Sequence, residues 1–297
     1  MQLKNFVVGF VLMLSSLWSL IVFPVYASSH CAYPYSGATY PYSTPAPSCE
    51  PCNRGIPYCD SIDRYWNDIK RDYCNFFSED NALWFGNYFV AAGILANSGL
   101  DKTIRDNWQQ EIRSTRSDRF FQPFNVIGGY SYHYVPLYLV CMGFGSWREN
   151  SIYANKIYLW GYRSLRTIIV GTIPQLVLAK TLGPGRPIKN QPSKWQPFKY
   201  SVGVSGHTFS GAIPFINAAF IVETPVLKGA LFVLSTFPGL ARINFDAHYT
   251  SQVLLGWSLA FLSANAVYNT DMQTNCGYNV GIYPRSDGFM VAASMEF

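Results

Sequence analysis

Charged side chains are scarce in this chain. Asp, Glu, Lys and Arg make up 13% of its 297 residues, about half of their share in an average soluble domain. The 22 lysines and arginines are scattered, so the chain lacks the clustered basic face on which nucleic-acid binding depends. We therefore exclude nucleic acid as a partner. The formal net charge of +5 favours an anionic small molecule or an anionic lipid surface instead.

Strand patterns and internal repeats are also nearly absent. From Asp60 onward, apolar residues recur at spacings of three and four, which predicts amphipathic helices and a mainly α helical bundle. After the first helix, which starts near Asp60, the predicted helices are 81–97, 101–115, 132–145, 152–181, 207–222, 226–240 and 248–268. Alternating residues appear only near the C-terminus, where two short runs around Pro-Arg-Ser-Asp-Gly predict a β-hairpin.

The N-terminal stretch has the features of a secretory signal. A lysine precedes a long apolar run, and Val25-Tyr26-Ala27 has the form of a signal-peptidase site. We expect cleavage after Ala27, which places the mature chain in the periplasm or the extracellular space. The run is long for a signal, so an uncleaved N-terminal anchor is the alternative.

Most of the cysteines are clustered just after that site. Five of the seven lie early in the mature chain: Cys31, Cys49, Cys52, Cys59 and Cys74. In an exported chain this clustering indicates disulfides. A zinc knot formed by the Cys49-x-x-Cys52 pair with Cys59 and Cys74 is the alternative. The count is odd, so at least one cysteine lacks an internal partner, and we expect this to be the apolar-flanked Cys141.

These patterns divide the chain into four parts. They are a signal peptide (1–27), a lead segment rich in Cys, Pro and Tyr (28–79), a helical domain (80–270) and a tail with the β-hairpin (271–297). Within the domain, two stretches without charges (120–147 and 249–270) are interrupted by polar residues. Such interruptions favour buried helices of a soluble or membrane-associated bundle, although helices inside a membrane bundle share the pattern.

Three short motifs place a cation or a histidine at a junction between a loop and a helix. They are KTLGPGRP, with Lys180 and Arg186; Ser205-Gly206-His207; and ARINFDAHYTSQ, with Arg242 and His248. Phosphate recognition requires this combination, because guanidinium groups bind phosphate oxygens while free N–H groups at a helix N-terminus point at the anion.

In this order the motifs resemble the signature of the type 2 phosphatidic acid phosphatase and vanadium haloperoxidase superfamily, over residues 150–268. The resemblance implies a helical bundle of the acid phosphatase/haloperoxidase type, with a phosphate pocket that needs no metal. It implies that His248 is the nucleophile that forms a phosphohistidine, and that His207 protonates the leaving alcohol and then activates water. The implied phosphate ligands are Lys180, Arg186, Ser205, Gly206 and Arg242.

The chain departs from the family pattern in its spacing and in three residues. Five residues, and not the usual six, separate Lys180 from Arg186. Val204 and Ala241 replace the usual proline and serine, and neither change removes a catalytic group. The third replacement is Gln252, which stands where the family usually has an aspartate that orients the nucleophile.

Gln252 should still orient His248. One helical turn places the two side chains together, so the amide oxygen can accept the Nδ1 proton. The amide cannot neutralise positive charge on the ring, whereas a carboxylate near 4 Å contributes about 4 kcal/mol at an effective dielectric of 20. We therefore count Gln252 as a catalytic residue and expect Gln252→Asp to raise turnover if the shorter side chain reaches. Asp246 should point elsewhere, and His30 and His133 receive no role.

The sequence therefore predicts an exported, metal-independent phosphatase. This phosphoric ester hydrolase would act on a phosphomonoester or lipid phosphate and would need no cofactor. Its partners would be a phosphorylated small molecule or lipid, with membrane association as an option. Two alternatives stay open: a haloperoxidase that uses vanadate as its cofactor, and a non-catalytic protein that binds phosphate or a lipid headgroup.

Overall fold

The computed structural model describes residues 62–129, 131–148, 151–275, 278–285 and 288–295. The signal peptide and the cysteines before residue 62 lie outside them. Of the clustered cysteines only Cys74 lies inside, so the disulfide and zinc alternatives stay predictions. The elements are α2 (Ile62–Phe76), α3 (Glu79–Asn97), α4 (Leu100–Asn107), the π-helical turn η2 (Trp108–Ile112), α5 (Thr115–Gly129), α6 (Ser131–Trp147), α7 (Ile152–Leu182), the 3-10 turn η3 (Pro187–Lys189), α8 (Gly206–Ile221), α9 (Pro225–Asn244), α10 (Thr250–Asn275), β1 (Tyr278–Arg285) and β2 (Gly288–Met295).

The predicted mainly α bundle is confirmed. Each predicted helix matches an observed one, and the prediction missed α5. The two C-terminal strands pair antiparallel, but residues 286–287 between them lie outside the described part, so the hairpin stays a prediction. Cys141 forms no disulfide within the described residues, and its expected lack of a partner stays a prediction because five other cysteines lie outside them.

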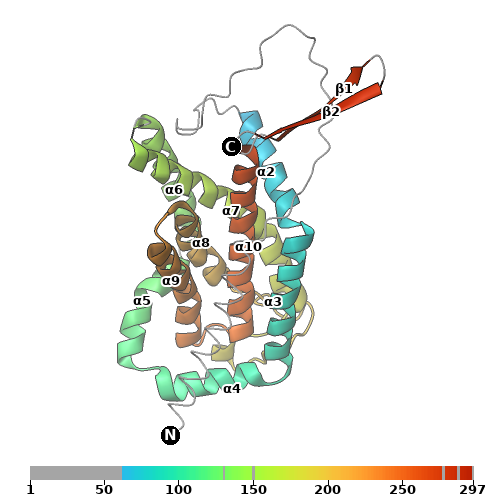
Figure 1. Ribbon diagram of the computed structural model, residues 1–297. Helices are drawn as coiled ribbons and strands as arrows, with labels where there is room; N and C mark the ends of the chain where they lie inside the picture. The colour runs from blue at the N-terminus through green and yellow to red at the C-terminus, as the bar shows by residue number, and fades with distance from the viewer. Residues whose placement is uncertain (1–61, 130, 149–150, 276–277, 286–287, 296–297) are drawn as a thin grey trace.

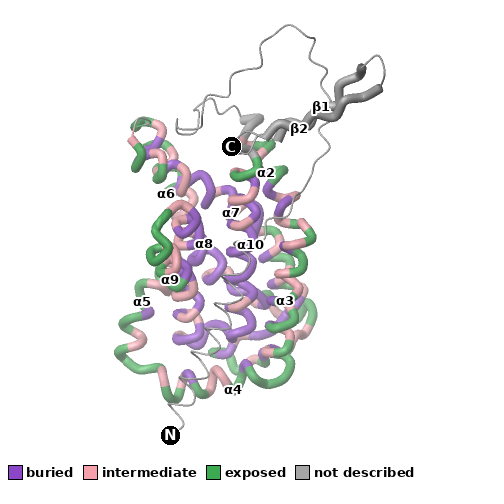
Figure 2. The backbone as a smooth tube through the Cα atoms, viewed as in Figure 1, coloured by how far each residue is buried: buried purple, intermediate pink, exposed green. Residues whose placement is uncertain are grey.

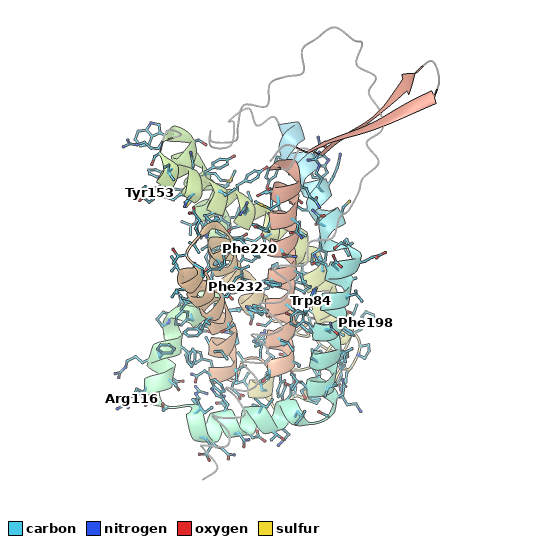
Figure 3. The ribbon with its side chains drawn as sticks, viewed as in Figure 1. Trp84, Arg116, Tyr153, Phe198, Phe220 and Phe232 are labelled. Atoms are coloured by element: carbon cyan, nitrogen blue, oxygen red, sulfur yellow. The ribbon has the colours of Figure 1, made fainter. Side chains whose placement is uncertain are left out.

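Helix α10 lies in the middle of the bundle and contacts α2, α3, α7, α8 and α9 (Figure 1). Most of α8 and α10 is buried, whereas α3, α5 and α9 expose their outer sides (Figure 2). Aromatic rings fill the space between α8 and α9, where Phe220 and Phe232 lie edge to face at 5.7 Å (Figure 3). This main core fixes the axes of the helices that carry the three motifs.

A smaller apolar cluster lies where η2, α5, α9 and α10 meet. Its buried members are Trp108, Phe121, Ala241, Ile243 and Val253. The cluster packs around the C-terminal end of α9, which carries Arg242. It therefore fixes one side of the candidate site.

A buried ion network joins α2, α7 and α10. Arg166, which is fully buried, donates two hydrogen bonds to Asp72, at 2.7 and 2.5 Å, and one to Asp271 at 2.7 Å. Arg163 also donates to Asp271, at 2.7 Å. Since Asp72 belongs to α2, this helix is part of the bundle.

The outer faces of four helices carry many exposed apolar side chains. They include Leu83, Val90 and Ile94 of α3; Leu137, Leu139, Val140 and Phe144 of α6; Ile173, Leu176 and Val177 of α7; and Val226, Leu227 and Val233 of α9. Two segments, Ile152–Lys189 and Pro225–Asn244, are long and apolar enough to cross a membrane, a property shared by core helices of soluble proteins.

Candidate active site

The three motifs meet at one end of the bundle. They occupy the loop after α7, the N-terminus of α8, and the turn between α9 and α10. Hydrogen bonds from Gln252 join all three, because its side chain contacts the first and third motifs and its carbonyl accepts from the Ser205 N–H at 2.9 Å.

The Gly-Pro-Gly loop holds Arg186. Gly183 ends α7 with φ +59, in the left-handed region that favours glycine. A Cβ on Gly185 would collide with Gln191, whose Oε1 accepts from the Arg186 N–H at 3.0 Å. Arg186 is half-buried, and its guanidinium forms no ion pair with any carboxylate in the described part of the chain.

Ser205 caps the N-terminus of α8. Its Oγ, fully buried, accepts from the Thr208 N–H at 3.3 Å and from the Thr208 hydroxyl at 2.9 Å. The Ser205 hydroxyl hydrogen can therefore be donated to a ligand. Amides of a first helical turn have no intrahelical acceptor, so the N–H groups of Gly206 and His207 are placed to bind an anion.

His207 lies against the end of α5. A Cβ on Gly129 would lie 3.3 Å from its Nε2, and one on Gly128 would lie 2.6 Å from its carbonyl oxygen. This glycine pair therefore makes room for the histidine. Burial, together with the charges of Arg242 and Arg186, lowers the pKa of His207 to about 4.

Arg242 lies in the last turn of α9 and donates through Nη1 to Asn125 of α5 at 2.5 Å. Its Nε is buried and has no partner among the described residues. Burial and the charge of Arg186 lower the pKa of Arg242 to about 10. Two cations thus lie close together, and neither pairs with a carboxylate in the part of the chain that the structure describes, which is the arrangement expected of an anion site.

His248 is buried, and its Nδ1 lies 2.7 Å from Oε1 of Gln252. The Gln252 Nε2 donates to the Gly185 carbonyl at 2.8 Å. Because that contact fixes the amide orientation, Oε1 faces the ring, so Nδ1 carries the proton and Nε2 holds the lone pair. Burial and then Arg242 lower the pKa of His248 to about 3, against a smaller opposing effect of Gln252.

The structure does not join Lys180 to the other predicted site residues. It is exposed in the last turn of α7, and it is absent from the charges that lower the pKa values of His207 and His248. As predicted, Asp246 points away from His248: it binds Arg105 of α4.

Sequence reasoning missed the contributions of α4 and α5. Asn125 and the Gly128–Gly129 pair contact site residues, and Asp101 and Arg105 bind the segment around His248. No short motif marks them, because they come from elements far from the motifs in sequence. Among the described residues, no cluster of three His, Cys, Asp or Glu side chains could hold a metal.

Fold and site together define a helical protein in which two arginines, two histidines of lowered pKa and a helix N-terminus meet at one end of the bundle. Residues 167–275 match the model of the PAP2 superfamily. The resemblance drawn from the three motifs is confirmed over this segment, which includes every predicted site residue. Helices α2 to α6 lie outside it.

The chain is also similar to a solved structure, described as the first transmembrane PAP2 type phosphatidylglycerolphosphate phosphatase from Bacillus subtilis. The sequences are 16% identical, the TM-score is 0.41, and the similarity covers 71% of this chain and 96% of the other. No curated protein matches the chain.

Proposed function

We propose that this protein is an exported phosphatase that hydrolyses a phosphomonoester or lipid phosphate through a phosphohistidine on His248. One observation carries the proposal: Arg186 and Arg242 meet two histidines of lowered pKa, and no carboxylate among the described residues compensates these cations. A bound phosphate supplies the missing negative charge.

Phosphate binding would use donor groups that have no partner among the described residues, such as the Nε of Arg242. Arg186 and Arg242 bind phosphate oxygens, with the Ser205 hydroxyl and the N–H groups of Gly206 and His207 as further donors. Hydrogen bonds of this charge-assisted kind contribute about 1.5–3 kcal/mol each. Lys180, exposed in the last turn of α7, would contribute only longer-range attraction to the anion.

The reaction has two steps. The lone pair of His248 Nε2 attacks phosphorus as the bond to the leaving alcohol breaks, and His207 gives that alcohol its proton. The phosphate dianion raises the pKa of His207, so the ring can carry the proton when substrate is bound. In the second step neutral His207 takes a proton from water, the oxygen attacks phosphorus, and the bond to His248 breaks.

Gln252 sets the tautomer needed for the first step. Its Oε1 keeps the proton on Nδ1 and leaves Nε2 free. The arrangement asks for no metal, because the protein supplies the positive charge through its own arginines. We propose that neither a metal nor another cofactor takes part.

We also propose that the protein works at a membrane surface. Exposed apolar side chains on α3, α6, α7 and α9 are more than a soluble enzyme needs. Two of the four helices are long and apolar enough to enter a bilayer. Such placement would suit a lipid phosphate as well as a soluble phosphomonoester.

The test is phosphate release by the purified protein from lipid phosphates, isoprenyl diphosphates, nucleotides and sugar phosphates. We expect turnover that persists after chelation and disappears in His248→Ala, with phosphate still bound by the variant. Activity that is lost on chelation and restored by zinc or magnesium would contradict the mechanism. Phosphate binding without turnover would identify a binding protein, and bromide oxidation with added vanadate would identify a haloperoxidase.

A further inference from the structure

Helix α4 and the turn η2 lie across the end of the bundle that holds the candidate site (Figure 1). Neither belongs to the segment that matches the superfamily model. Arg105 follows Asp101 by four residues, and Trp108 and Gln109 follow Arg105 by three and four, spacings that place neighbours on one helix face. All four side chains bind the segment 243–251.

Asp101 binds on the C-terminal side of His248. Its carboxylate is fully buried and accepts from the N–H of Ser251 at 3.0 Å and from its hydroxyl at 2.5 Å. Ser251 lies in the first turn of α10, where a carboxylate satisfies free N–H groups and interacts favourably with the helix dipole. The contact fixes the start of α10 three residues after His248.

Arg105 binds on the N-terminal side of His248. Its Nε and Nη2 donate to the two carboxylate oxygens of Asp246, each at 2.6 Å. Asp246 has φ +54, and its carbonyl accepts from the Ile188 N–H at 2.9 Å. The Arg105 contact therefore holds a strained turn that also touches the loop of Arg186.

Side chains of η2 form further hydrogen bonds to the C-terminal end of α9. Gln109 Nε2 donates to the Ile243 carbonyl at 2.9 Å, and Trp108 Nε1 donates to Asn244 Oδ1 at 3.2 Å. Arg105 also neutralises Asp246, the carboxylate nearest in sequence to Arg242 and His248. The pocket thereby keeps its excess of positive charge.

We propose that α4 and η2 fix the position of the nucleophile, with Asp101 and Arg105 as positioning residues that hold the turn around His248 from both sides. This inference rests on the proposed function of His248. Neither residue touches the phosphate ligands, so loss of either should slow the chemical step and leave phosphate binding unchanged.

The test compares Asp101→Ala, Arg105→Ala and Asp101→Asn with Lys102→Ala. Lys102 lies on the solvent side of α4 and pairs with Asp106, which also lies 3.5 Å from Arg105. Its variant removes an ion pair from the same helix and leaves the contact of Arg105 with Asp246 in place. We expect kcat to fall by roughly 10- to 100-fold in both site-facing alanine variants, as for other small misplacements of reacting groups. Asn caps helices about as well as Asp, so Asp101→Asn should recover most of the rate, and Lys102→Ala should match the wild type.

Titration with inorganic phosphate separates misplacement from unfolding. The alanine variants should bind one phosphate per chain with unchanged affinity, and their KM should stay unchanged. Wild-type kcat in both folded alanine variants would overturn the proposal, as would a kcat loss matched by an equal loss of phosphate-binding sites.

A second readout keeps the proposal independent of turnover. The Nδ1 proton of His248, held by Gln252, should give a proton resonance that disappears in His248→Ala. It should broaden or shift in Asp101→Ala and stay in place in Lys102→Ala. No turnover by the wild type would refute the proposed function, whereas an unchanged resonance in Asp101→Ala would refute the positioning role.

Discussion

The protein contains two clusters of arginines whose environments are opposite. In the network of α2, α7 and α10, Arg166 is fully buried, but Asp72 and Asp271 bind three of its N–H groups. At the motif end, Arg186 and Arg242 meet no carboxylate within the part of the chain that the structure describes. In the first cluster the carboxylates outweigh burial and raise the arginine pKa, whereas at the second the pKa of Arg242 falls to about 10.

The difference separates structural charge from functional charge. A buried cation with its carboxylates in place holds helices together, and removing one partner leaves a buried charge uncompensated. A cluster of cations with unpaired donors is unfavourable until an anion arrives. The phosphate that we propose as ligand would supply the missing negative charge.

The largest change in stability should come from the paired cluster. Replacing Arg166 by Met, or Asp72 by Ala, removes one partner and should lower the free energy of unfolding by about 3–5 kcal/mol. The free energy of unfolding of the double variant Arg166→Met/Asp72→Leu should fall by less than the sum of the losses in the single variants. Denaturant unfolding measures the free energy of unfolding of each variant. A loss below about 1 kcal/mol in both single variants would contradict the claim that the paired cluster holds the helices together.

Arg242→Gln should show the reverse pattern. The substitution removes a buried charge that has no carboxylate partner among the described residues, so the free energy of unfolding should stay the same or rise. Turnover should fall by roughly 100- to 1,000-fold, as when one donor to a transition-state oxyanion is lost. Steady-state kinetics and denaturant unfolding test both parts, and destabilisation as large as that of Arg166→Met would show that the two clusters are alike.

Substitutions of Gln252 test whether its two side-chain hydrogen bonds hold His248 and the Gly185 loop in place. Gln252→Leu should leave the Nδ1 proton of His248 and the Gly185 carbonyl unsatisfied, at a cost of about 1–3 kcal/mol each. On sequence grounds Gln252→Asp should raise turnover, but the structure reverses that expectation. A carboxylate has no hydrogen to donate to the Gly185 carbonyl, so this variant should lose activity, and kcat above the wild-type value would contradict the role of that contact.

The smallest effect concerns pH. The folded pKa of His207, about 4, lies below the ordinary histidine value near 6.5. As pH falls from about 6.5 to 4, the unfolded chain therefore gains a proton that the folded chain does not, and the folded state loses stability. His207→Gln removes this contribution, so the wild type should lose stability relative to the variant over that range.

The difference in stability between the wild type and His207→Gln removes, to a first approximation, the contributions of groups that titrate in both proteins. Burial raises the pKa of Asp101 to about 6, which acts in the opposite direction but is present in both proteins. Inorganic phosphate should raise the histidine pKa and reduce the difference. A difference in unfolding free energy that does not change with pH would show that His207 is not held neutral by its surroundings.

The sequence predicted the helices and the motif residues because these depend on local patterns. Hydrophobic spacing located α7 to α10, and the one-turn separation of His248 and Gln252 predicted their contact correctly. It did not predict α5, since Pro123 and the Gly128–Gly129 pair are signals that usually end helices. In the fold that glycine pair makes room for His207.

The remainder of the site depends on contacts between distant segments. Asp101 and Arg105 lie about 140 residues or more from their partners, and no local pattern predicts such pairing. The second contact of Gln252 was missed for the same reason, because Gly185 approaches it only after the loop folds back. The family pattern has aspartate at position 252, and because a carboxylate donates no hydrogen bond, the pattern did not suggest that Gln252 donates one to Gly185.

The central claim is that the cluster of unpaired cations holds a phosphoryl group on His248. The most direct measurement mixes the His207→Ala protein with an aryl phosphate, whose leaving group needs no protonation, and quenches the reaction in alkali, where phosphohistidine survives. Peptide mass spectrometry should find the phosphoryl group on His248, and His248→Ala should show none. Turnover by the wild type with the phosphoryl group on another residue, or with none trapped in His207→Ala, would contradict the account.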